Sequence, residues 1–200
     1  VLLAYNRRFY ASVLKAKEII EEDGGLSSFN FEFTEWSHII KTLKKEEAEH
    51  QNWFLGNSTH IIDTAFYLGG VPDQLAAFVS GEGEMDWHKA SSNYSGAGIS
   101  TKKALFSYQA NWQAPGRWVM EFLTKKNRLV FKPIEKLQIQ VLGSVAVNEV
   151  EGIDYTLDEK YKPGLFLQTK CFLEGKYDEF CDVHEQKEMI DKYYLKMSNY

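Results

Sequence analysis

The stretch FNFEFT at residues 29–34 alternates phenylalanine with polar side chains, which is the pattern of a half-buried β-strand. Further strands are indicated at residues 74–79, 106–112, 118–122, 128–131 and 137–141. The segments that join these later strands are mostly short, and short connections favour antiparallel neighbours. The sequence therefore predicts a large, mostly antiparallel sheet.

Helical spacing of apolar residues occurs on both sides of these strands. It predicts helices over residues 9–22, 59–68, 164–173 and 183–197. Paired glycines end the first two helices, and Pro72 follows the second pair. The charged residues 41–50 are expected to form a surface connection. The predicted fold class is α+β, a sheet with helices on one face.

The strand at residues 118–122 predicts how the two faces of the sheet are used. One face carries Trp118, Met120 and Phe122, and the other carries Val119, Glu121 and Leu123. Because the second set contains a charge, we expect the first set in the more deeply buried layer. The face without helices would pair with a second subunit, since large exposed apolar patches are rare on monomers, and either set of residues could point to that partner. A homo-oligomer through the sheet face is therefore expected.

Composition limits the class of protein. The 200 residues are 44% hydrophobic and 14% aromatic, which supports a packed core and excludes collagen-like, coiled-coil and disordered chains. The net charge of −5 argues against a nucleic-acid partner. No apolar run approaches the roughly 20 residues needed to span a bilayer, so no membrane partner is expected. Cys171 and Cys181 indicate free thiols in a reducing cytoplasm, and neither has a second cysteine at zinc-binding spacing.

The chain begins with Val1 rather than Met, and residues 1–5 are apolar enough to predict a buried strand at the very start. This suggests a fragment of a longer protein. We expect residues 1–8 to be the remnant of a preceding domain and residues 9–200 to form one α/β domain.

The densest polar motif is GNSTHIID at residues 56–63. Ser58 or Thr59 could cap a helix, which would place His60 in the first turn, where the helix dipole disfavours the charged imidazolium. A neutral imidazole is what a general base needs, and Asp63 lies close enough on the helix to orient it. Two alternatives stay open: a capping segment with a partly buried histidine, or a metal held by His60 and Asp63, for which no third ligand is evident.

Two further motifs could bind a ligand. Asn6, Arg7 and Arg8 follow the first apolar run, where arginine could hold a phosphate or carboxylate through two hydrogen bonds; otherwise the arginines are simply solvated. The motif WQAPGRW at residues 112–118 places tryptophan beside polar groups, which suits sugar rings. Its alternative is a Pro-Gly turn with two core tryptophans. The glycine-dense residues 96–98 lack the dinucleotide-binding fingerprint.

The order and spacing of Tyr5-Asn6-Arg7-Arg8-Phe9 and His60-Ile61-Ile62-Asp63 resemble the glucose–fructose oxidoreductase and inositol dehydrogenase family. Residues 106–136 resemble a branch associated with polysaccharide-precursor gene clusters. The resemblance implies that residues 1–8 are the last strand of a missing Rossmann domain, and that the remainder is the substrate and oligomerisation domain.

The resemblance also implies a function. It is NAD(P)-dependent oxidation of a hydroxyl on a sugar, nucleotide sugar or cyclitol, with no metal and with NAD or NADP held mainly by the missing domain. This chain alone would be inactive. The implied catalytic residues are His60 and Asn57, the implied substrate-binding residues are Asn6, Asp63, Trp112 and Arg117, and Arg7 is implied at the cofactor.

One position departs from the family pattern. Many members carry Asp four residues before the histidine, and here that position is Gly56. Asn57 is adjacent but cannot exchange a proton as a carboxylate does. An alternative function is therefore a non-catalytic sugar-binding or assembly module with the same fold.

Overall fold

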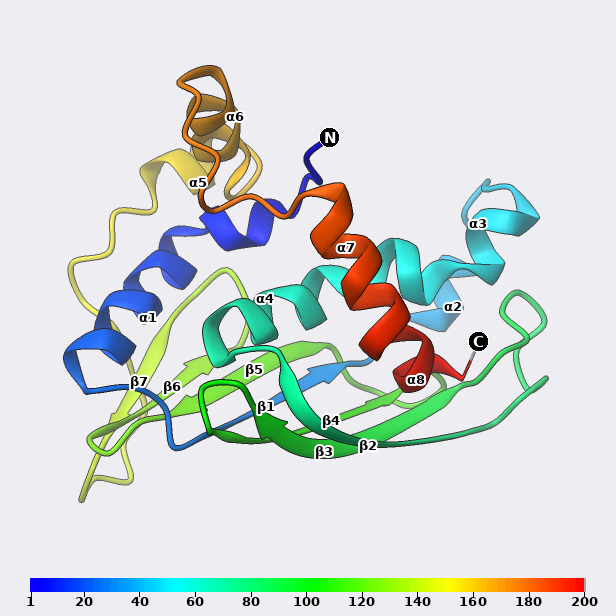
Figure 1. Cartoon of the computed structure of the whole chain (residues 1–200), viewed down its shortest axis with the longest axis horizontal. Helices are drawn as coiled ribbons and strands as arrows, with labels where there is room; N and C mark the ends of the chain where they lie inside the picture. Colours follow the sequence, from blue (N-terminus) through cyan, green and yellow to red (C-terminus); the bar gives the residue numbers. More distant parts are fainter. Residues whose placement is uncertain (200) are drawn as a thin grey trace.

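A computed structural model describes residues 1–199, and its central feature is one eight-stranded sheet (Figure 1). The strand order is β2-β3-β4-β1-β5-β6-β7-β8, and neighbouring strands are antiparallel except for the parallel pair β1 and β4. The strands are β1 Ser28–Phe33, β2 Pro72–Ser80, β3 Asn93–Ser100, β4 Leu105–Asn111, β5 Trp118–Leu123, β6 Asn127–Phe131, β7 Gln138–Val141 and β8 Asn148–Glu149. The mostly antiparallel sheet predicted from the sequence is confirmed.

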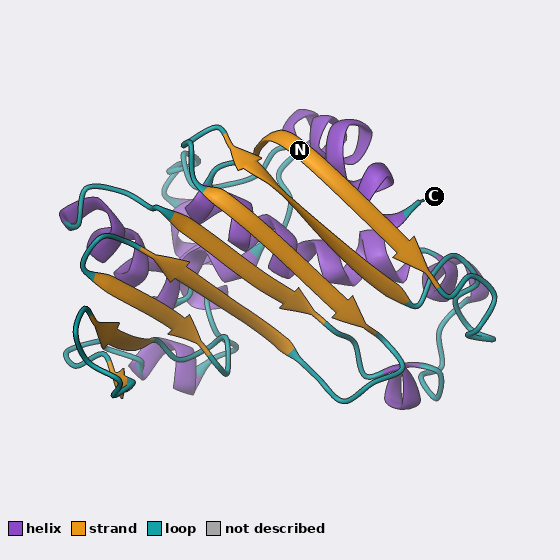
Figure 2. Ribbon diagram, turned by 90° about the horizontal axis from the view of Figure 1, so that it is seen from below, coloured by secondary structure: helices purple, strands orange, loops and turns teal. Residues whose placement is uncertain are grey.

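The helices lie on one face of this sheet, as Figure 2 shows from the opposite side. Helix α4 packs on β1 and β5, and α8 packs on β2 and β3. The helical segments are η1 Asn6–Phe9, α1 Ala11–Glu22, α2 Ser37–Ile40, α3 Glu47–Gln51, η2 Phe54–Ser58, α4 Thr59–Gly69, α5 Thr156–Lys160, α6 Leu165–Leu173, α7 Val183–Met189, η3 Ile190–Tyr194 and α8 Leu195–Ser198. Within residues 1–199, no helix has both the length and the apolar character needed to cross a membrane.

The core lies between the helices and the covered face of the sheet. Phe29, Phe31 and Phe33 of β1 are each at most 2% exposed, and the ring of Phe66 on α4 meets the first two edge-on. Burying one such side chain contributes about 1.5–3 kcal/mol. The side chains of Trp118, Met120 and Phe122 are also buried on this face, as expected.

Strand β3 was not predicted, because its glycine-rich sequence looks like a loop. The structure gives the reason for the glycines. A Cβ on Gly96 would lie 2.4 Å from the ring of Tyr108, and a Cβ on Gly98 would lie 1.9 Å from the carbonyl oxygen of Gln74. Glycine is therefore required because the rings of Tyr108 and Phe106 on β4 and the backbone of β2 lie against this strand, so packing overrides strand propensity.

The first residues also differ from the prediction. Residues 1–5 form no strand; Leu2 makes a single isolated bridge with Asp182, and Val1 is 95% exposed. Only Tyr5 of this stretch is buried. The prediction of a buried strand is therefore wrong for the described residues, because the segment makes only a few backbone hydrogen bonds, to Cys181 and Val183 around this bridge, and joins no sheet.

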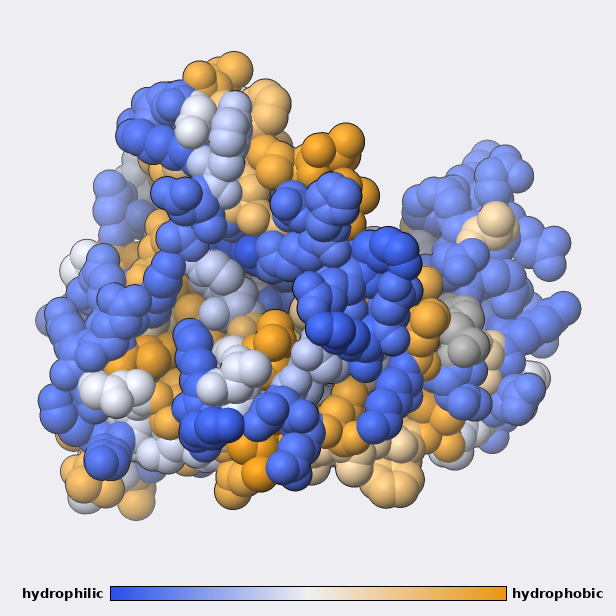
Figure 3. Space-filling model, in the orientation of Figure 1, coloured by the Kyte–Doolittle hydropathy of each residue, from blue (hydrophilic) through white to orange (hydrophobic). Residues whose placement is uncertain are grey.

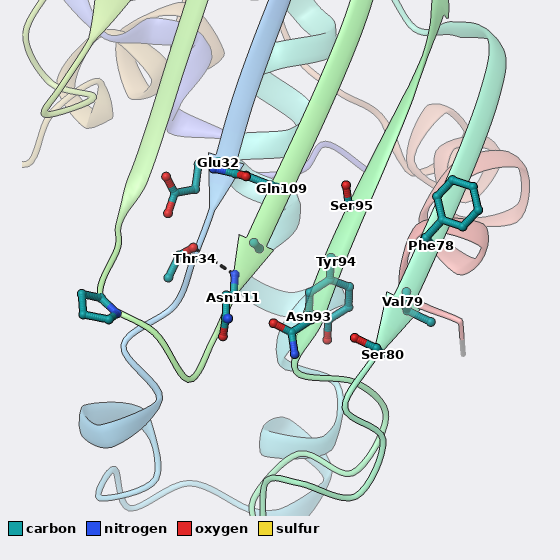
Figure 4. A pocket seen from close by; sticks show the side chains of 12 residues that line it. Glu32, Thr34, Phe78, Val79, Ser80, Asn93, Tyr94, Ser95, Gln109 and Asn111 are labelled. Carbon is teal, nitrogen blue, oxygen red and sulfur yellow. Dashed lines mark hydrogen bonds between the residues drawn. The ribbon is translucent and has the colours of Figure 1, made fainter.

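The uncovered face of the sheet is more polar than expected. Phe78 and Leu105 are exposed on it, but most of its side chains are Ser, Asn, Gln, Glu and Ala. A hollow of about 580 Å³ at one end is lined mainly by polar residues, and there the hydroxyl of Thr34 accepts a hydrogen bond from the backbone N–H of Asn111 at 3.1 Å (Figure 4). The large aromatic residues that motivated a subunit interface lie on the helix-covered face instead.

Candidate functional site

His60 is the second residue of α4, but the helical coil begins well before it. Residues Phe54–Ser58 form a π-helical turn that runs directly into α4. The predicted caps are therefore absent: the Ser58 hydroxyl donates to Glu35, and the Thr59 hydroxyl donates to the carbonyl of Leu55 at 2.7 Å. Short π-helical turns often mark functional sites, because they reorient the side chains that follow.

The imidazole of His60 is held neutral by its surroundings. Burial lowers its pKa to about 4, and the positive charges of Arg7 and Lys162 contribute to this lowering. Its ring meets the Tyr5 ring edge-on at 5.0 Å, and its Nδ1 is buried without a hydrogen-bond partner among residues 1–199. The expected neutral state is thus supported, but by burial and nearby cations rather than by a helix N-terminus.

Asp63 does not orient His60. Its Oδ2 accepts a hydrogen bond from Nε of Arg8 at 2.9 Å, and its Oδ1 accepts one from Nη2 at 2.6 Å. Both side chains are buried, and Glu185 adds a third acceptor at 2.9 Å from Nη2. Asp63 is 2% exposed, so this pairing leaves it no surface for a substrate, and Arg8 is not a solvated arginine.

The same group of residues does not favour a metal ion. Ligand atoms of Asp63, Cys181 and Glu185 lie within 4.8 Å of one another. However, the guanidinium of Arg8 already occupies both carboxylates, and burial raises the pKa of the Cys181 thiol to about 12. A protonated thiol is a poor metal ligand, and the two carboxylates already pair with Arg8. The cluster therefore holds an arginine side chain rather than a metal ion. Both cysteines are free thiols.

Asn6 links η1 to the start of α6. Its Nδ2 donates to the carbonyl of Pro163 at 2.8 Å, and the residue is 6% exposed. The backbones of Asn6 and Gly164 lie so close together that a Cβ on Gly164 would be 2.1 Å from the Asn6 carbonyl oxygen. Gly164 also has a φ of +70°, which other residues rarely adopt. Asn6 therefore connects η1 to the residues just before α6.

The two tryptophans of the WQAPGRW motif lie in different places. Trp112 is 1% exposed, stacks on Trp87 at 5.8 Å and donates its indole N–H to the Phe33 carbonyl at 3.2 Å. The core alternative therefore holds for Trp112, which has no face available to a sugar. Trp118 instead carries the guanidinium of Arg7 over its ring, with the guanidinium carbon 4.5 Å from the centroid.

Arg117 lies in the turn before β5 and borders the same ring. Its guanidinium carbon is 5.2 Å from the Trp118 centroid and 4.8 Å from the centroid of Trp36. Its side chain is 52% exposed. The structure thus brings Arg7 and Arg117 together on one tryptophan, although they are 110 residues apart in the sequence.

Glu35 follows β1, is 2% exposed and was not predicted as a site residue from the sequence. Its carboxylate accepts hydrogen bonds from Nδ2 of Asn57 and Oγ of Ser58, both at 2.8 Å, and lies 3.7 Å from Nη1 of Arg117. Burial raises the pKa of this carboxyl despite these donors. An acid directly after a buried phenylalanine strand was the signal that could have identified it.

We group five residues from different segments as a candidate site: Arg7, Glu35, Asn57, His60 and Arg117. Contacts link Asn57, Glu35 and Arg117, Trp118 lies beside both arginines, and the charge of Arg7 lowers the pKa of His60. The five residues come from η1, the end of β1, the π-helical turn, α4 and the turn before β5. Arg7 connects His60 with the residues around Trp118, because its charge lowers the pKa of His60 and its guanidinium lies over the Trp118 ring. The arrangement offers a neutral base beside positive charge.

Comparisons with known proteins identify the fold. No protein-family model matches the chain, and no curated protein sequence matches it. Among solved structures, levoglucosan dehydrogenase in complex with NADH matches with a TM-score of 0.68 and 20% identity, over 98% of this chain and 63% of that one. A complex of the same enzyme with NADH and levoglucosan matches with a TM-score of 0.56 and 22% identity, over 76% and 46%.

A dehydrogenase from Clostridium difficile matches with a TM-score of 0.66 and 14% identity, over 99% of this chain and 61% of that one. The chain therefore spans about half to two thirds of the length of these structures. At such identities the likeness establishes the fold. The expected fold, a mostly antiparallel sheet with helices on one face, is confirmed, and these dehydrogenase structures share it.

Proposed function

We propose that this chain is the substrate domain of an NAD(P)-dependent oxidoreductase that acts on a hydroxyl of a sugar, nucleotide sugar or cyclitol. The observation that carries the proposal is His60: a mostly buried imidazole, neutral because burial lowers its pKa to about 4, at the same site as Arg7. The fold supports it, since levoglucosan dehydrogenase, whose structures contain NADH, shares this fold.

In this proposal His60 accepts the proton of the substrate hydroxyl, because a neutral imidazole can act as a general base. Asn57 is held by Glu35 at 2.8 Å and would position the loop that precedes His60. When bound, NAD or NADP would accept the hydride from the carbon that bears this hydroxyl, which would become a carbonyl group. Arg7 would border the nicotinamide end, while a preceding domain would hold the phosphates.

A surface at the start of the chain supports the proposal of a preceding domain. Hydrophobic residues gather over α6 and the N-terminus (Figure 3). Val1, Phe172 and Leu173 are between 51% and 95% exposed there. A hollow of about 440 Å³ between residues 1–4 and α6 is lined mostly by apolar side chains. Such a surface is typical of contact with another domain, and we assign residues 1–8 to the junction.

The experiment uses the full-length protein with NAD or NADP and a panel of neutral and anionic sugars and cyclitols, and follows reduction of the cofactor. Reduction with at least one of them is expected. A protein that binds the cofactor but reduces it with no member of the panel would favour the second candidate, a non-catalytic sugar-binding or assembly module.

The variant Gly56→Asp separates these two functions further. A side chain at position 56 meets nothing within 4 Å of its Cβ, so aspartate can be accommodated. If the missing carboxylate limits proton transfer, this variant should raise kcat of the full-length protein. Gly56→Asn, which has the same shape without the charge, is the matched control.

We further propose that the uncovered face of the sheet pairs with a second copy of the chain, and that the protein works in the cytoplasm in polysaccharide-precursor synthesis. Exposed Phe78 and Leu105 support pairing, while the polar character of the face argues for a wet interface. Sedimentation of the full-length protein tests pairing; a strict monomer at micromolar concentration would contradict it.

A further inference from the structure

Two arginines lie against the indole of Trp118 at the border of the candidate site. The guanidinium carbons of Arg7 and Arg117 are 4.5 Å and 5.2 Å from the ring centroid, so their separation cannot exceed the sum of these distances. Trp118 is 3% exposed and begins β5, so the core fixes its position. Burial lowers the pKa of Arg7, and repulsion by Arg117 contributes.

Neither guanidinium is saturated by the protein. Nε of Arg7 is buried without a hydrogen-bond partner, and no carboxylate of residues 1–199 lies within 4.0 Å of this side chain. Arg117 has one ion pair, with Glu35 at 3.7 Å, and its side chain remains 52% exposed. Arg8 is the contrast, because two carboxylates occupy its guanidinium. A buried donor without an acceptor is costly, and a bound ligand could remove that cost.

The surrounding charges also favour an anion. Lys162 is a third cation that acts on His60. The acidic groups that act on the pKa of Arg7 are the hydroxyl of Tyr10 and the carboxyls of Glu135 and Glu35. The carboxylate of Glu35 lies 3.7 Å from Nη1 of Arg117 and makes no ion pair with Arg7, so among residues 1–199 the two arginines share no closer carboxylate. Arginine pairs are well suited to phosphate and carboxylate groups, which match the fork of the guanidinium.

We propose that Arg7 and Arg117 bind an oxyanion, either a phosphate or a carboxylate, on the molecule whose hydroxyl lies at His60. The identity of that molecule as substrate rests on the proposed function, but the oxyanion site does not. The inference narrows the substrate class to sugar phosphates, nucleotide sugars and sugar acids. Trp36, which stacks on Arg117 and donates its indole N–H to the Gly116 carbonyl at 2.9 Å, holds the turn in place.

The test measures calorimetric binding of inorganic pyrophosphate to the full-length protein without cofactor. Arg117→Gln should weaken binding about 10- to 100-fold, the range expected for losing a hydrogen bond to a charged group. Arg117→Lys should retain part of the affinity, because lysine keeps the charge and loses the fork. Arg128→Gln is the matched control: it removes the same charge from β6, where Arg128 pairs with Glu121, and should change nothing.

Two results would overturn the oxyanion site. One is the absence of saturable pyrophosphate binding by the wild-type protein at millimolar concentration. The other is equal weakening in Arg117→Gln and Arg128→Gln, which would indicate a general charge effect. Because Arg117 is half exposed, its variants should fold, and circular dichroism verifies this.

Calorimetry also distinguishes the two sources of the oxyanion. Binding of glucose, glucose 6-phosphate, glucuronate and UDP-glucose is compared with binding of NAD. If Arg117→Gln weakens an anionic sugar and leaves NAD unchanged, the substrate carries the oxyanion. If it weakens NAD alone, the group belongs to the dinucleotide and the substrate assignment is overturned. These readouts do not need turnover, so failure of the proposed oxidation is detected separately.

Discussion

Arg8 and Asp63 form a two-point ion pair that fastens η1 to α4. The hydrogen bonds measure 2.9 Å and 2.6 Å, and both side chains are buried. Although burial opposes the charged form, the carboxylates of Asp63 and Glu185 raise the pKa of Arg8. The pair brings the segment that carries Arg7 against the helix that carries His60, so the candidate site depends on it.

Asp63→Asn should destabilise the protein by about 3 kcal/mol, because removing one partner of a buried ion pair leaves the other charge poorly compensated. Glu185 cannot replace Asp63, since its side chain is 46% exposed. The measurement is the free energy of unfolding from urea titrations. Glu18→Gln, which breaks the surface pair with Lys15, is the control and should leave stability nearly unchanged. Equal effects of the two variants would contradict the structural role of Asp63.

His60→Ala in the full-length protein should lower kcat about 10²- to 10⁴-fold, the usual cost of losing a general base, with a much smaller change in KM. His38, which lies on the short helix α2, provides the control variant His38→Ala. Steady-state kinetics on the best substrate of the panel give both parameters. Turnover close to that of the wild type would remove His60 from the mechanism.

The stability of the folded protein should depend on pH through His60. Its pKa is lowered to about 4 by burial and nearby cations, whereas an unfolded histidine titrates near its ordinary pKa of about 6.5. Between these values the unfolded state binds more protons, so stability is full above the unfolded value and falls as pH decreases toward 4. Wild type should therefore lose more stability than His60→Gln between neutral pH and the folded pKa. Parallel losses would show that His60 is not perturbed.

Trp112 should matter for stability and not for sugar binding. Trp112→Ala should cost about 3–5 kcal/mol, as truncation of a large core aromatic does. The milder Trp112→Phe keeps the ring packed against Trp87 and is suited to kinetics. We expect its KM for the substrate to be unchanged. A KM increase in Trp112→Phe without any loss of stability would restore Trp112 as a ligand contact.

A pair of glycine substitutions separates packing from propensity on the same helical segment. Gly69→Ala should destabilise by about 1–3 kcal/mol, because its Cβ would lie 2.5 Å from the buried ring of Phe29. Gly56→Ala meets nothing within 4 Å and should stabilise by up to about 1 kcal/mol through helix propensity. Thermal unfolding of both variants tests the prediction, and the same sign of change in both would refute it.

The sequence by itself determined the strands that alternate, the helices that cover them and the position of His60 on a helix. These follow from local periodicity, because a buried face repeats every two residues in a strand and about every 3.6 in a helix. Strand β3 was not predicted, because Gly96 and Gly98 carry no side chains and so show no alternation of apolar and polar residues. These glycines leave room for the rings of Tyr108 and Phe106, which lie on the neighbouring strand β4.

Tertiary structure alone decided what each polar residue of the site does. Asp63 is three residues from His60, yet its partner is Arg8, which is 55 residues away in the chain. Glu35 meets Asn57, and Arg7 meets Arg117 across Trp118, through contacts that no local pattern encodes. Hydrogen bonds and ion pairs depend on distances of a few ångströms between side chains, and those distances are set only when the sheet, the π-helical turn and η1 are packed together.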